Sequence, residues 1–290
     1  MIFVGFTFYA SNSLIKLRKK RLKYLISFTF TENKPSKMCI FESYTFNQNL
    51  FIMTKRLSIV LLFGFLVACS STTGNNDPIN TDPLYVEGAG VTDIDGNSYR
   101  TIVLGNQEWM AENLKTTRYR NGDLIQNITD DEAWADAATG AWSAYDNEEE
   151  NIGRYGKLYN WFAVNDSRRI CPEGWRVPTN QQYVEYISRL GSNANVVHSL
   201  RKTGSDAWEG TNAQATNTSG FTAIPGGRRL GGEFSDLGRE GAWWTSSSSG
   251  PGNDPAQAWR ILYEPLSRQY ILINANATKP SGLSVRCIKE

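Results

Sequence analysis

Residues 171–191 read CPEGWRVPTNQQYVEYISRLG, and this stretch joins a turn-rich segment directly to a helix signal. Proline and glycine are frequent over 171–178, which predicts turns. Thr179 is placed to cap a helix predicted over 180–190, where apolar residues recur at intervals of three and four positions. Gly191 follows the last of them as a stop signal. The stretch therefore predicts one amphipathic helix that begins directly after an irregular loop.

The region after this helix is predicted to consist of strands joined by long loops. Short apolar runs alternate with Gly-, Ser- and Asn-rich segments, a pattern typical of strands bounded by loops. The predicted strands are 221–224, 242–246, 258–263, 269–273 and 284–288. Residues 225–232 are predicted to form a flexible loop with surface arginines. Because the strands follow a helix and do not alternate with helices, the predicted fold class is α+β.

The region before the helix opens on a predicted hairpin. Residues 91–95 and 98–104 alternate in polarity around the turn Gly96-Asn97. Further on, the apolar and aromatic run 158–164 is expected to be buried, whereas the acidic run 146–151 is expected to form an exposed loop. We find no internal repeat in the sequence.

The net charge of +1 conceals two segments of opposite sign. Residues 1–68 hold ten basic and two acidic side chains, whereas residues 69–290 hold twenty basic and 27 acidic ones. The second segment has no overall basic field, so nucleic acid is not an expected partner. The single histidine, His198, argues against a multi-histidine metal site. We therefore predict neither a metal nor another cofactor.

Residues 53–68 have the features of a secretory signal peptide. Met53–Arg56 supplies a positive start, and the apolar stretch of eleven residues that follows is too short to span a bilayer. The segment ends in Leu-Val-Ala-Cys, which resembles a bacterial lipobox. Cys69 is therefore the expected lipidated N-terminus, and a free cysteine at the end of a hydrophobic helix is the alternative. With Ser70 next in the chain, we expect an exported protein held by its lipid, on the outer membrane or cell surface.

A signal peptide at this position sets the limits of the other segments. Because a signal peptide begins a chain, residues 1–52 are interpreted as an upstream segment that is not translated, with a cytoplasmic extension before a signal anchor as the alternative. Residues 69–87 are rich in Ser, Thr, Asn, Asp and Pro and are predicted to be a flexible tether. Residues 88–290 are predicted to form one folded domain.

Cys171 and Cys287 are the only cysteines that remain in this domain once Cys69 is lipidated. An exported location permits a disulfide, and we expect the two to be bonded to each other. Two buried free thiols are the alternative. A reactive pair is the least favoured interpretation, because neither cysteine belongs to a Cys-x-x-Cys motif.

Several segments, in one order, resemble the Fibrobacter succinogenes major paralogous domain, a family of bacterial surface and secreted modules. They are residues 93–99, 105–115, 155–161, 171–179, 215–221, 243–247 and 284–287. The resemblance covers nearly all of 91–290. It implies no established enzymatic activity.

A more distant resemblance concerns the fold. The Arg-x-Pro-Thr that opens the helix, the Trp-Trp-x-Ser at 243–246 and the Val-Arg-Cys at 285–287 look like the C-type-lectin-like fold and its formylglycine-generating-enzyme branch. This resemblance implies a single domain with short strands, few helices and long loops. Oxidase members of that branch use a cysteine pair, but Cys171 and Cys287 occupy positions that look structural. The calcium-binding motifs of the lectins are absent from the sequence.

No combination of residues predicts a catalytic site. His198 lacks the neighbours of a Ser-His-Asp arrangement, and no spacing singles out a pair among the acidic residues. Aromatic residues are abundant, with nine Trp and ten Tyr in residues 69–290. Those in family-like apolar segments are expected in the core. The candidates for ligand contact are Trp134, Trp142, Trp208 and Trp259, which lie near polar loops.

These observations favour a lipid-anchored envelope module that binds an extracellular ligand without catalysis. Glycan is the first expected ligand class, because flat aromatic rings stack on sugar faces, and protein is the second. The alternative is a structural or accessory subunit of a cell-surface assembly. An enzyme of the formylglycine-generating type is the third hypothesis.

Overall fold

The computed structural model describes residues 82–191, 195–205, 207–248, 250 and 254–290. Cys69, the signal segment 53–68 and the upstream segment 1–52 lie outside the described residues. Among the described residues, no helix is both long and apolar enough to cross a membrane.

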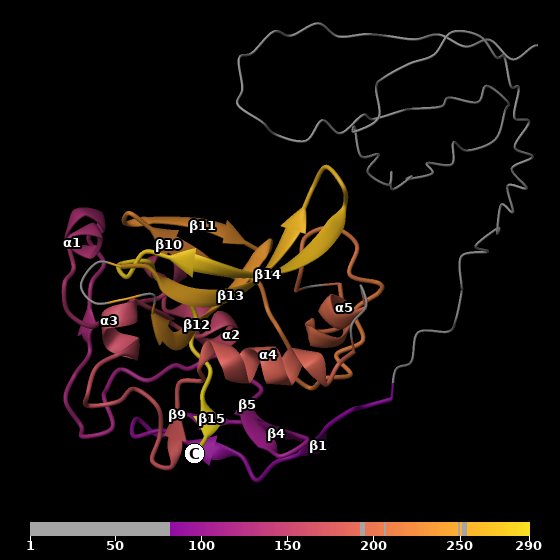
Figure 1. The fold of residues 1–290 in the computed structure, drawn as a ribbon. Helices are drawn as coiled ribbons and strands as arrows, with labels where there is room; N and C mark the ends of the chain where they lie inside the picture. The colour runs from indigo at the N-terminus through magenta and orange to yellow at the C-terminus, as the bar shows by residue number, and fades with distance from the viewer. Residues whose placement is uncertain (1–81, 192–194, 206, 249, 251–253) are drawn as a thin grey trace, which may run out of the picture. The chain divides into compact units, whose positions relative to one another are not determined.

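Strands dominate the described chain, and two five-stranded sheets contain most of them (Figure 1). The first sheet, in the order β1-β4-β5-β15-β9, consists of β1 (Val86–Glu87), β4 (Thr101–Leu104), β5 (Gln107–Met110), β15 (Ile288–Lys289) and β9 (Trp175–Arg176). The second, in the order β11-β10-β12-β13-β14, consists of β10 (Gly226–Leu230), β11 (Glu233–Leu237), β12 (Glu240–Ser248), β13 (Ala256–Glu264) and β14 (Gln269–Ala277).

The remaining elements are short. Two small sheets consist of β2 (Val91–Thr92) with β3 (Ser98–Tyr99), and of β6 (Gln126–Asn127), β7 (Ala141–Ser143) and β8 (Leu158–Tyr159). The helices are α1 (Asp131–Ala135), the 3-10 helix η1 (Tyr145–Asn147), α2 (Glu150–Tyr155), α3 (Trp161–Val164), α4 (Asn180–Ser188) and α5 (Val196–Leu200). The fold is therefore mixed α and β, with mostly strands, few helices and a curled sheet, as predicted at this level.

Helix α4 confirms the prediction made from 171–191. The Thr179 hydroxyl oxygen accepts the Gln182 backbone N–H at 3.3 Å, and the Gln182 side chain accepts the Thr179 backbone N–H at 3.0 Å. This reciprocal cap stabilises a helix start by about 1 kcal/mol. The helix then buries Tyr183 and Tyr186 against Trp109, with ring centroids 5.0 and 5.1 Å apart. Local sequence signals thus define where α4 begins and which face it buries.

Three of the predicted strands lie within the long strands of the second sheet. Residues 242–246, 258–263 and 269–273 fall inside β12, β13 and β14, each of which extends further than predicted. The strand predicted at 221–224 is wrong. These residues form one isolated bridge, Arg201↔Ala223, and Thr222 has a φ of +53°, which interrupts extended structure. Residues 284–288 are also mostly irregular, since β15 begins at Ile288.

The prediction of a flexible basic loop at 225–232 is wrong as well. Most of it forms β10, and Arg229 within it is fully buried. The Arg229 guanidinium donates to the carbonyl oxygens of Ile128 at 2.6 Å and Thr129 at 3.0 Å, and it lies 4.5 Å from the rings of both Trp134 and Phe234. The guanidinium also donates to the Gly232 carbonyl oxygen at 2.6 Å and forms an ion pair with Asp131 at 2.8 Å. Because the acceptors at 128, 129 and 131 lie about 100 residues earlier in the chain, the segment 225–232 alone does not predict this burial.

The predicted hairpin near the start of the fold is confirmed at its turn, but residues 101–104, which were predicted to belong to it, form β4 of the first sheet. Strands β2 and β3 pair with Val91 opposite Tyr99, around a turn in which Gly96 has a φ of +85°. Strand β1 pairs with β4, so Val86–Glu87 belongs to the sheet although it lies in the segment predicted as a tether. The run 158–164 is buried as expected, apart from the half-buried Phe162. Residues 146–150 are exposed as expected, but they are divided between η1 and α2.

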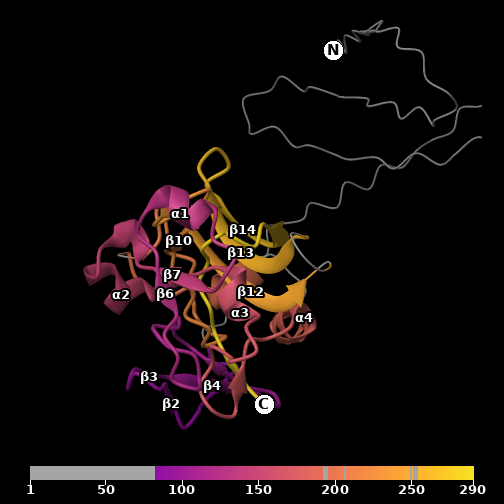
Figure 2. The ribbon, with the colours of Figure 1, turned by 90° about the vertical axis from the view of Figure 1, so that its left-hand side faces the viewer.

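The core lies on both faces of the second sheet. Trp244 and Ala258 face one buried cluster, and Trp243 and Ile261 face the other, which α4 covers. The predicted bond between Cys171 and Cys287 is present, and both residues are buried in the cluster that contains Trp244. The disulfide joins the loop before α4 to the last segment of the chain, 116 residues later. In Figures 1 and 2, the first sheet lies at the opposite end of the fold from the β13–β14 hairpin.

Candidate functional site

Three of the four tryptophans proposed as ligand contacts are buried, which corrects the expectation that they lie at a loop surface. Trp134 is fully buried, Trp208 is 3 % exposed and Trp142 is 9 % exposed. Each indole N–H donates to a backbone carbonyl inside the fold, at distances of 2.8, 3.0 and 3.1 Å respectively. Trp134 lies on α1 and Trp142 in β7, so neither belongs to a surface loop. The physical reason for the burial is that a buried indole gains apolar contact while its N–H finds an acceptor.

Trp259, the fourth candidate, is half-buried. Its ring stacks on that of Tyr183 at a centroid distance of 6.3 Å, and its N–H donates to the Asn180 side-chain oxygen at 2.9 Å. Among the described residues, no Trp, Tyr or Phe is classed as exposed. The aromatic rings of the described chain are therefore buried or half-buried, and most of them build the core.

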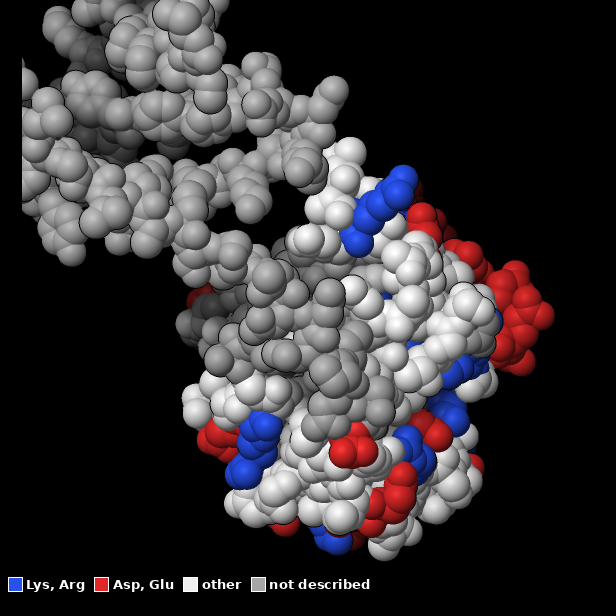
Figure 3. All heavy atoms as spheres, turned by 90° about the vertical axis from the view of Figure 1, so that its right-hand side faces the viewer, with Lys and Arg blue, Asp and Glu red and all other residues white. Residues whose placement is uncertain are grey.

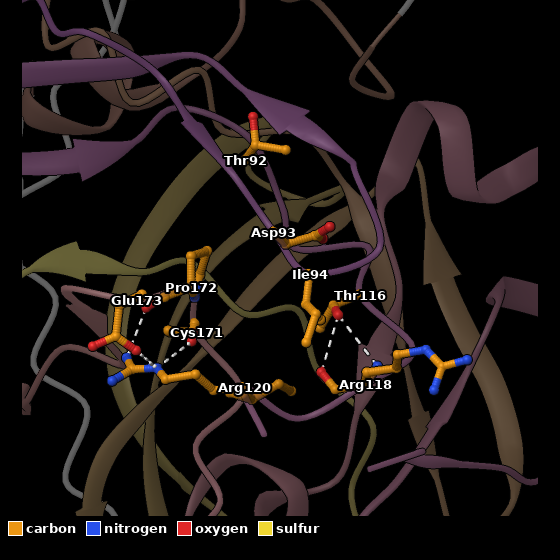
Figure 4. Close-up of a pocket in the computed structure, with 10 residues that line it drawn as sticks. Thr92, Asp93, Ile94, Thr116, Arg118, Arg120, Cys171, Pro172 and Glu173 are labelled. Atoms are coloured by element: carbon orange, nitrogen blue, oxygen red, sulfur yellow. Dashed lines mark hydrogen bonds and ion pairs between the residues drawn. The ribbon is translucent and has the colours of Figure 1, made fainter. Parts of the chain in front are cut away.

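A cavity of about 250 Å³ lies between the β2–β3 hairpin, the segment 116–120 and the loop that carries Cys171 (Figure 4). It is lined by Thr92, Asp93, Ile94, Thr116, Arg118, Arg120, Ile170, Cys171, Pro172 and Glu173. The volume is slightly below the range usual for drug-sized ligands, so it fits a side chain or another small group. This cavity is the candidate site.

Asp93 occupies one wall, but its carboxylate is already used by the hairpin turn. The backbone N–H groups of Asp95 and Asn97 donate to its Oδ1 at 3.0 and 2.9 Å. The Tyr99 hydroxyl donates to its Oδ2 at 2.6 Å. Burial, and then this hydrogen bond, raise the pKa of Tyr99 far above its ordinary value, so the phenol remains a donor. The buried Asp93 thus fixes the turn that positions Ile94.

Arg118 lies on the opposite side of the cavity and is held by Asp95. Its Nε is 3.3 Å from an Asp95 oxygen, and the arginine side chain remains 44 % exposed. Burial acts to raise the pKa of Asp95, but hydrogen bonds from the backbone and hydroxyl of Thr117 outweigh it and hold the pKa below its usual value. Asp95 is therefore a carboxylate at neutral pH, and Arg118 is positioned without being covered.

Arg120 reaches across the cavity wall to the disulfide loop (Figure 4). Its guanidinium donates to the carbonyl oxygens of Cys171 at 3.1 Å, of Pro172 at 2.7 Å and of Trp175. Ion pairs at 3.6 Å join it to Glu173 and Glu290. Because its donors are used by the protein itself, Arg120 shapes the cavity. The exposed surface left for a ligand is the apolar side of Ile94, which is 50 % exposed, together with the open part of Arg118, whereas Pro172 lines the cavity but is buried.

His198, the candidate general base, is not among the residues that line this cavity, whereas the disulfide-bonded Cys171 is. His198 is on α5, where its Nδ1 lies 2.8 Å from Arg201 Nη2. In the described part of the chain, no group of three or more His, Cys, Asp or Glu side chains is arranged to hold a metal ion. On the face shown in Figure 3, acidic and basic side chains are interspersed over the uncovered area.

His198 makes folding stability dependent on pH near neutrality. Burial, and then the positive charge of Arg201, lower its pKa below the ordinary 6.5. The unfolded chain therefore binds a proton before the folded chain does, so stability is fully present above about pH 6.5 and falls as pH decreases below it. We expect a lower urea midpoint at pH 5.5 than at pH 7.5. No other histidine is present to share this effect.

The variant His198→Asn is the matched control for this pH dependence, because its side-chain oxygen can still accept from Arg201 but does not titrate. Its urea midpoint should change less between the two pH values than that of the wild type. An equal change in both proteins would show that His198 is not the group responsible.

The cavity was not predicted from the sequence. The turn at 93–97 and the loop at 171–178 were predicted, but nothing in the sequence indicates that Arg118 and Arg120 lie beside them. The family-like segments include Ile94 and Pro172 but not Arg118 or Arg120, so the resemblance gave no signal for this contact. The distance in sequence between Ile94 and Pro172 hides their proximity.

The family model described as the Fibrobacter succinogenes major domain matches residues 102–289. The match includes α4, the second sheet and both bonded cysteines, and it spans more than half of the chain. The chain belongs to this family. Comparison with curated proteins and with solved structures found no match.

Proposed function

We propose that this chain is a lipid-anchored, non-catalytic binding module of the bacterial cell envelope. The disulfide between Cys171 and Cys287 supports an oxidising, exported location. The signal-like segment 53–68 and the lipobox-like sequence before Cys69 support export with a lipid on that cysteine. The proposed location is the outer membrane or cell surface. Intact mass of the chain isolated from its host tests this part, since the proposal requires an N-terminus at a lipid-modified Cys69.

We further propose that the fold is C-type-lectin-like. In support, α4 opens directly after Arg-Val-Pro-Thr, and the Trp-Trp-Thr-Ser segment lies in β12 at the centre of the second sheet. The disulfide ties the loop before α4 to the closing segment of the chain. A solved structure whose strand connections differ from those of lectin-like domains would contradict this proposal.

Because the aromatic rings are buried or half-buried, we place protein before glycan as the proposed ligand class. A glycan-binding surface usually needs a flat ring that is open to solvent, and the described part of the chain has no exposed Trp, Tyr or Phe. The cavity instead offers the exposed apolar side chain of Ile94. Arg118 also lines the cavity, but its Nε pairs with Asp95 and its Nη1 donates to the Gly122 carbonyl oxygen at 2.9 Å. An apolar side chain of a partner fits against Ile94. We therefore propose a protein ligand, with the cavity as the observation that supports it.

Capture of surface partners from intact cells tests the proposal. The variant Ile94→Asp places a charge in the cavity, and we expect it to lose the protein partner that the wild-type chain retains. Val184→Asp is the matched control, because Val184 is a 40 % exposed aliphatic residue on α4. If both variants capture the protein partner equally well, the cavity is not its binding site. If the wild type and both variants all bind a glycan array, the ligand is a glycan and it binds at another surface.

The second candidate function is a structural or accessory role in a cell-surface assembly. The observation that favours it is the last strand of the second sheet, β14, which pairs with β13 alone among the described strands. A long unpaired edge is typical of proteins that associate through strands.

A further inference from the structure

Arg201 is a fully buried cation at the end of α5. Its guanidinium donates to the Asn212 side-chain oxygen at 2.7 Å and to the Val197 carbonyl oxygen at 3.4 Å. The guanidinium carbon lies 3.5 Å from the centre of the Tyr270 ring, which belongs to β14. Among the described residues, no carboxylate forms an ion pair with Arg201. A buried charge without a counter-ion depends on each of its neutral partners.

His198 supplies a further acceptor for this guanidinium. Its Nδ1 lies 2.8 Å from Arg201 Nη2. Because arginine has only hydrogen-bond donors, Nδ1 must be the unprotonated acceptor and the imidazole must be neutral. Burial, and then the positive charge of Arg201, lower the pKa of His198. The folded arrangement around α5 is therefore specific for the neutral form of the ring.

The groups that face His198 offer little to balance a positive charge on it. Among the described groups, Arg201 supplies the charge that acts on the pKa of His198. Residues 195–200 and 215–219, which are joined by hydrogen bonds to the His198 carbonyl oxygen, include no other charged residue. From β14, Tyr270 contributes a neutral phenol, because burial raises its pKa. The charged residues of segment 202–209 are Lys202, Asp206, which lies outside the described residues, and Glu209, which is in an ion pair with Arg239.

Arg201 connects α5 to two other parts of the fold. Asn212, which accepts from Arg201, also donates to the Lys202 carbonyl oxygen at 2.8 Å. Tyr270, which lies against the guanidinium, meets the Trp208 ring edge to face at a centroid distance of 5.6 Å. The apolar residues of α5 and Trp208 lie in the same buried cluster. The position of α5 against β14 therefore depends on how well this one guanidinium is satisfied.

We propose that protonation of His198 is a pH-sensitive switch that detaches α5 from β14 while the second sheet stays folded. An imidazolium at this position lies beside the Arg201 guanidinium, and Nη2 loses its acceptor. Detachment exposes the apolar side chains of Val197 and Leu200, which are 7 % and 4 % exposed in the folded chain. In acidic surroundings the chain then presents an apolar surface that is covered at neutral pH. This inference is independent of the ligand proposed for the cavity.

Proton NMR of the full chain in detergent tests the first step, the protonation itself. The chain contains one histidine, so a single imidazole resonance reports on His198 without further assignment. Its titration midpoint is expected below the ordinary value of about 6.5. A midpoint at or above that value would overturn the proposal, because the folded chain would then favour the protonated ring.

Hydrogen exchange of the full chain in detergent at pH 7.5 and 5.5, corrected for intrinsic rates, tests the opening. The amides of α5 are expected to exchange through a smaller opening free energy than those of β13. The open population should rise by up to about tenfold at pH 5.5, because a released histidine with a pKa of about 6.5 takes up a proton. Equal protection of α5 and β13 at both pH values would overturn the proposal, since α5 would then open only with the whole fold.

The variant His198→Asn is the matched control for the exchange measurement. Its side chain can accept from Arg201 at both pH values, so the opening of α5 should change by less than about twofold. An equal rise in the wild type and in this variant would show that another group causes the opening, and it would also overturn the proposal.

Discussion

Replacing Arg286 by alanine is expected to lower the free energy of unfolding by about 3–5 kcal/mol, one of the two largest single effects in this protein. The Arg286 side chain is fully buried. Its Nε donates to the Asn113 side-chain oxygen at 2.9 Å, and its terminal nitrogens donate to the carbonyl oxygens of Phe221 and Thr222. Alanine removes these donors and leaves a cavity. Several buried carbonyl and amide oxygens then lack a hydrogen-bond donor.

The surroundings of Arg286 explain how a cation is kept in the core without a carboxylate hydrogen-bonded to it. Its guanidinium carbon lies 4.0 Å from the Phe221 ring and 5.5 Å from the Trp243 ring, both of which present electron-rich faces. Burial lowers its pKa to about 10, so it remains charged at neutral pH. Asn113 also accepts from the Trp243 indole N–H at 2.9 Å, which links Arg286 to β12.

Chemical denaturation of Arg286→Ala, with Arg268→Ala as the control, measures this effect. Arg268 is exposed on the β13–β14 hairpin, and its truncation should change stability by less than about 0.5 kcal/mol. Measurements at low protein concentration keep any association of the chains out of the comparison. If both variants unfold at the same denaturant concentration, the buried network around Arg286 contributes nothing to stability.

Removing the disulfide is expected to have a comparable effect. The bond between Cys171 and Cys287 closes a loop with a sequence separation of 116 residues. The chain-entropy model assigns about 4–5 kcal/mol to a loop of this length, and measured losses in native proteins are about 2–5 kcal/mol. The double variant Cys171→Ala, Cys287→Ala should therefore unfold at a clearly lower denaturant concentration than the wild type.

A control separates the cross-link from the packing of its residues. The wild-type chain, reduced while unfolded and then refolded in reductant, keeps both side chains but not the bond. It should lose nearly as much stability as the double alanine variant. Retention of full stability by the reduced chain would show that the bond is dispensable, because the buried thiols alone would then suffice.

Local signals in the sequence were sufficient for part of the fold. Thr179 and the spacing of apolar residues after it identified α4, and alternation around Gly96 identified the first hairpin. These features depend on neighbours in sequence, so a short window contains their cause. The long strands β12 and β13 were recognised from their apolar centres, but their ends depend on pairing with each other.

Features that depend on distant segments could not be predicted in the same way. Arg229 looked like a surface residue because its glycine-rich neighbours suggest a loop, but three of its acceptors, at 128, 129 and 131, lie about 100 residues earlier in the chain. Trp134 and Trp208 looked accessible because polar loops lie near them in the sequence. The cavity combines Ile94, Arg118 and Pro172 from three separate segments, so its existence follows only from the assembled fold.

Site-specific photo-crosslinking in intact cells is the measurement that tests the proposed binding site most directly. A photoreactive amino acid is placed at Ile94 in one variant and at Val184 in a matched control. If the cavity binds a protein ligand, illumination produces a discrete protein adduct from position 94 and none from position 184. The absence of any protein adduct at position 94, in a chain shown to be correctly exported and folded, would contradict the proposed function.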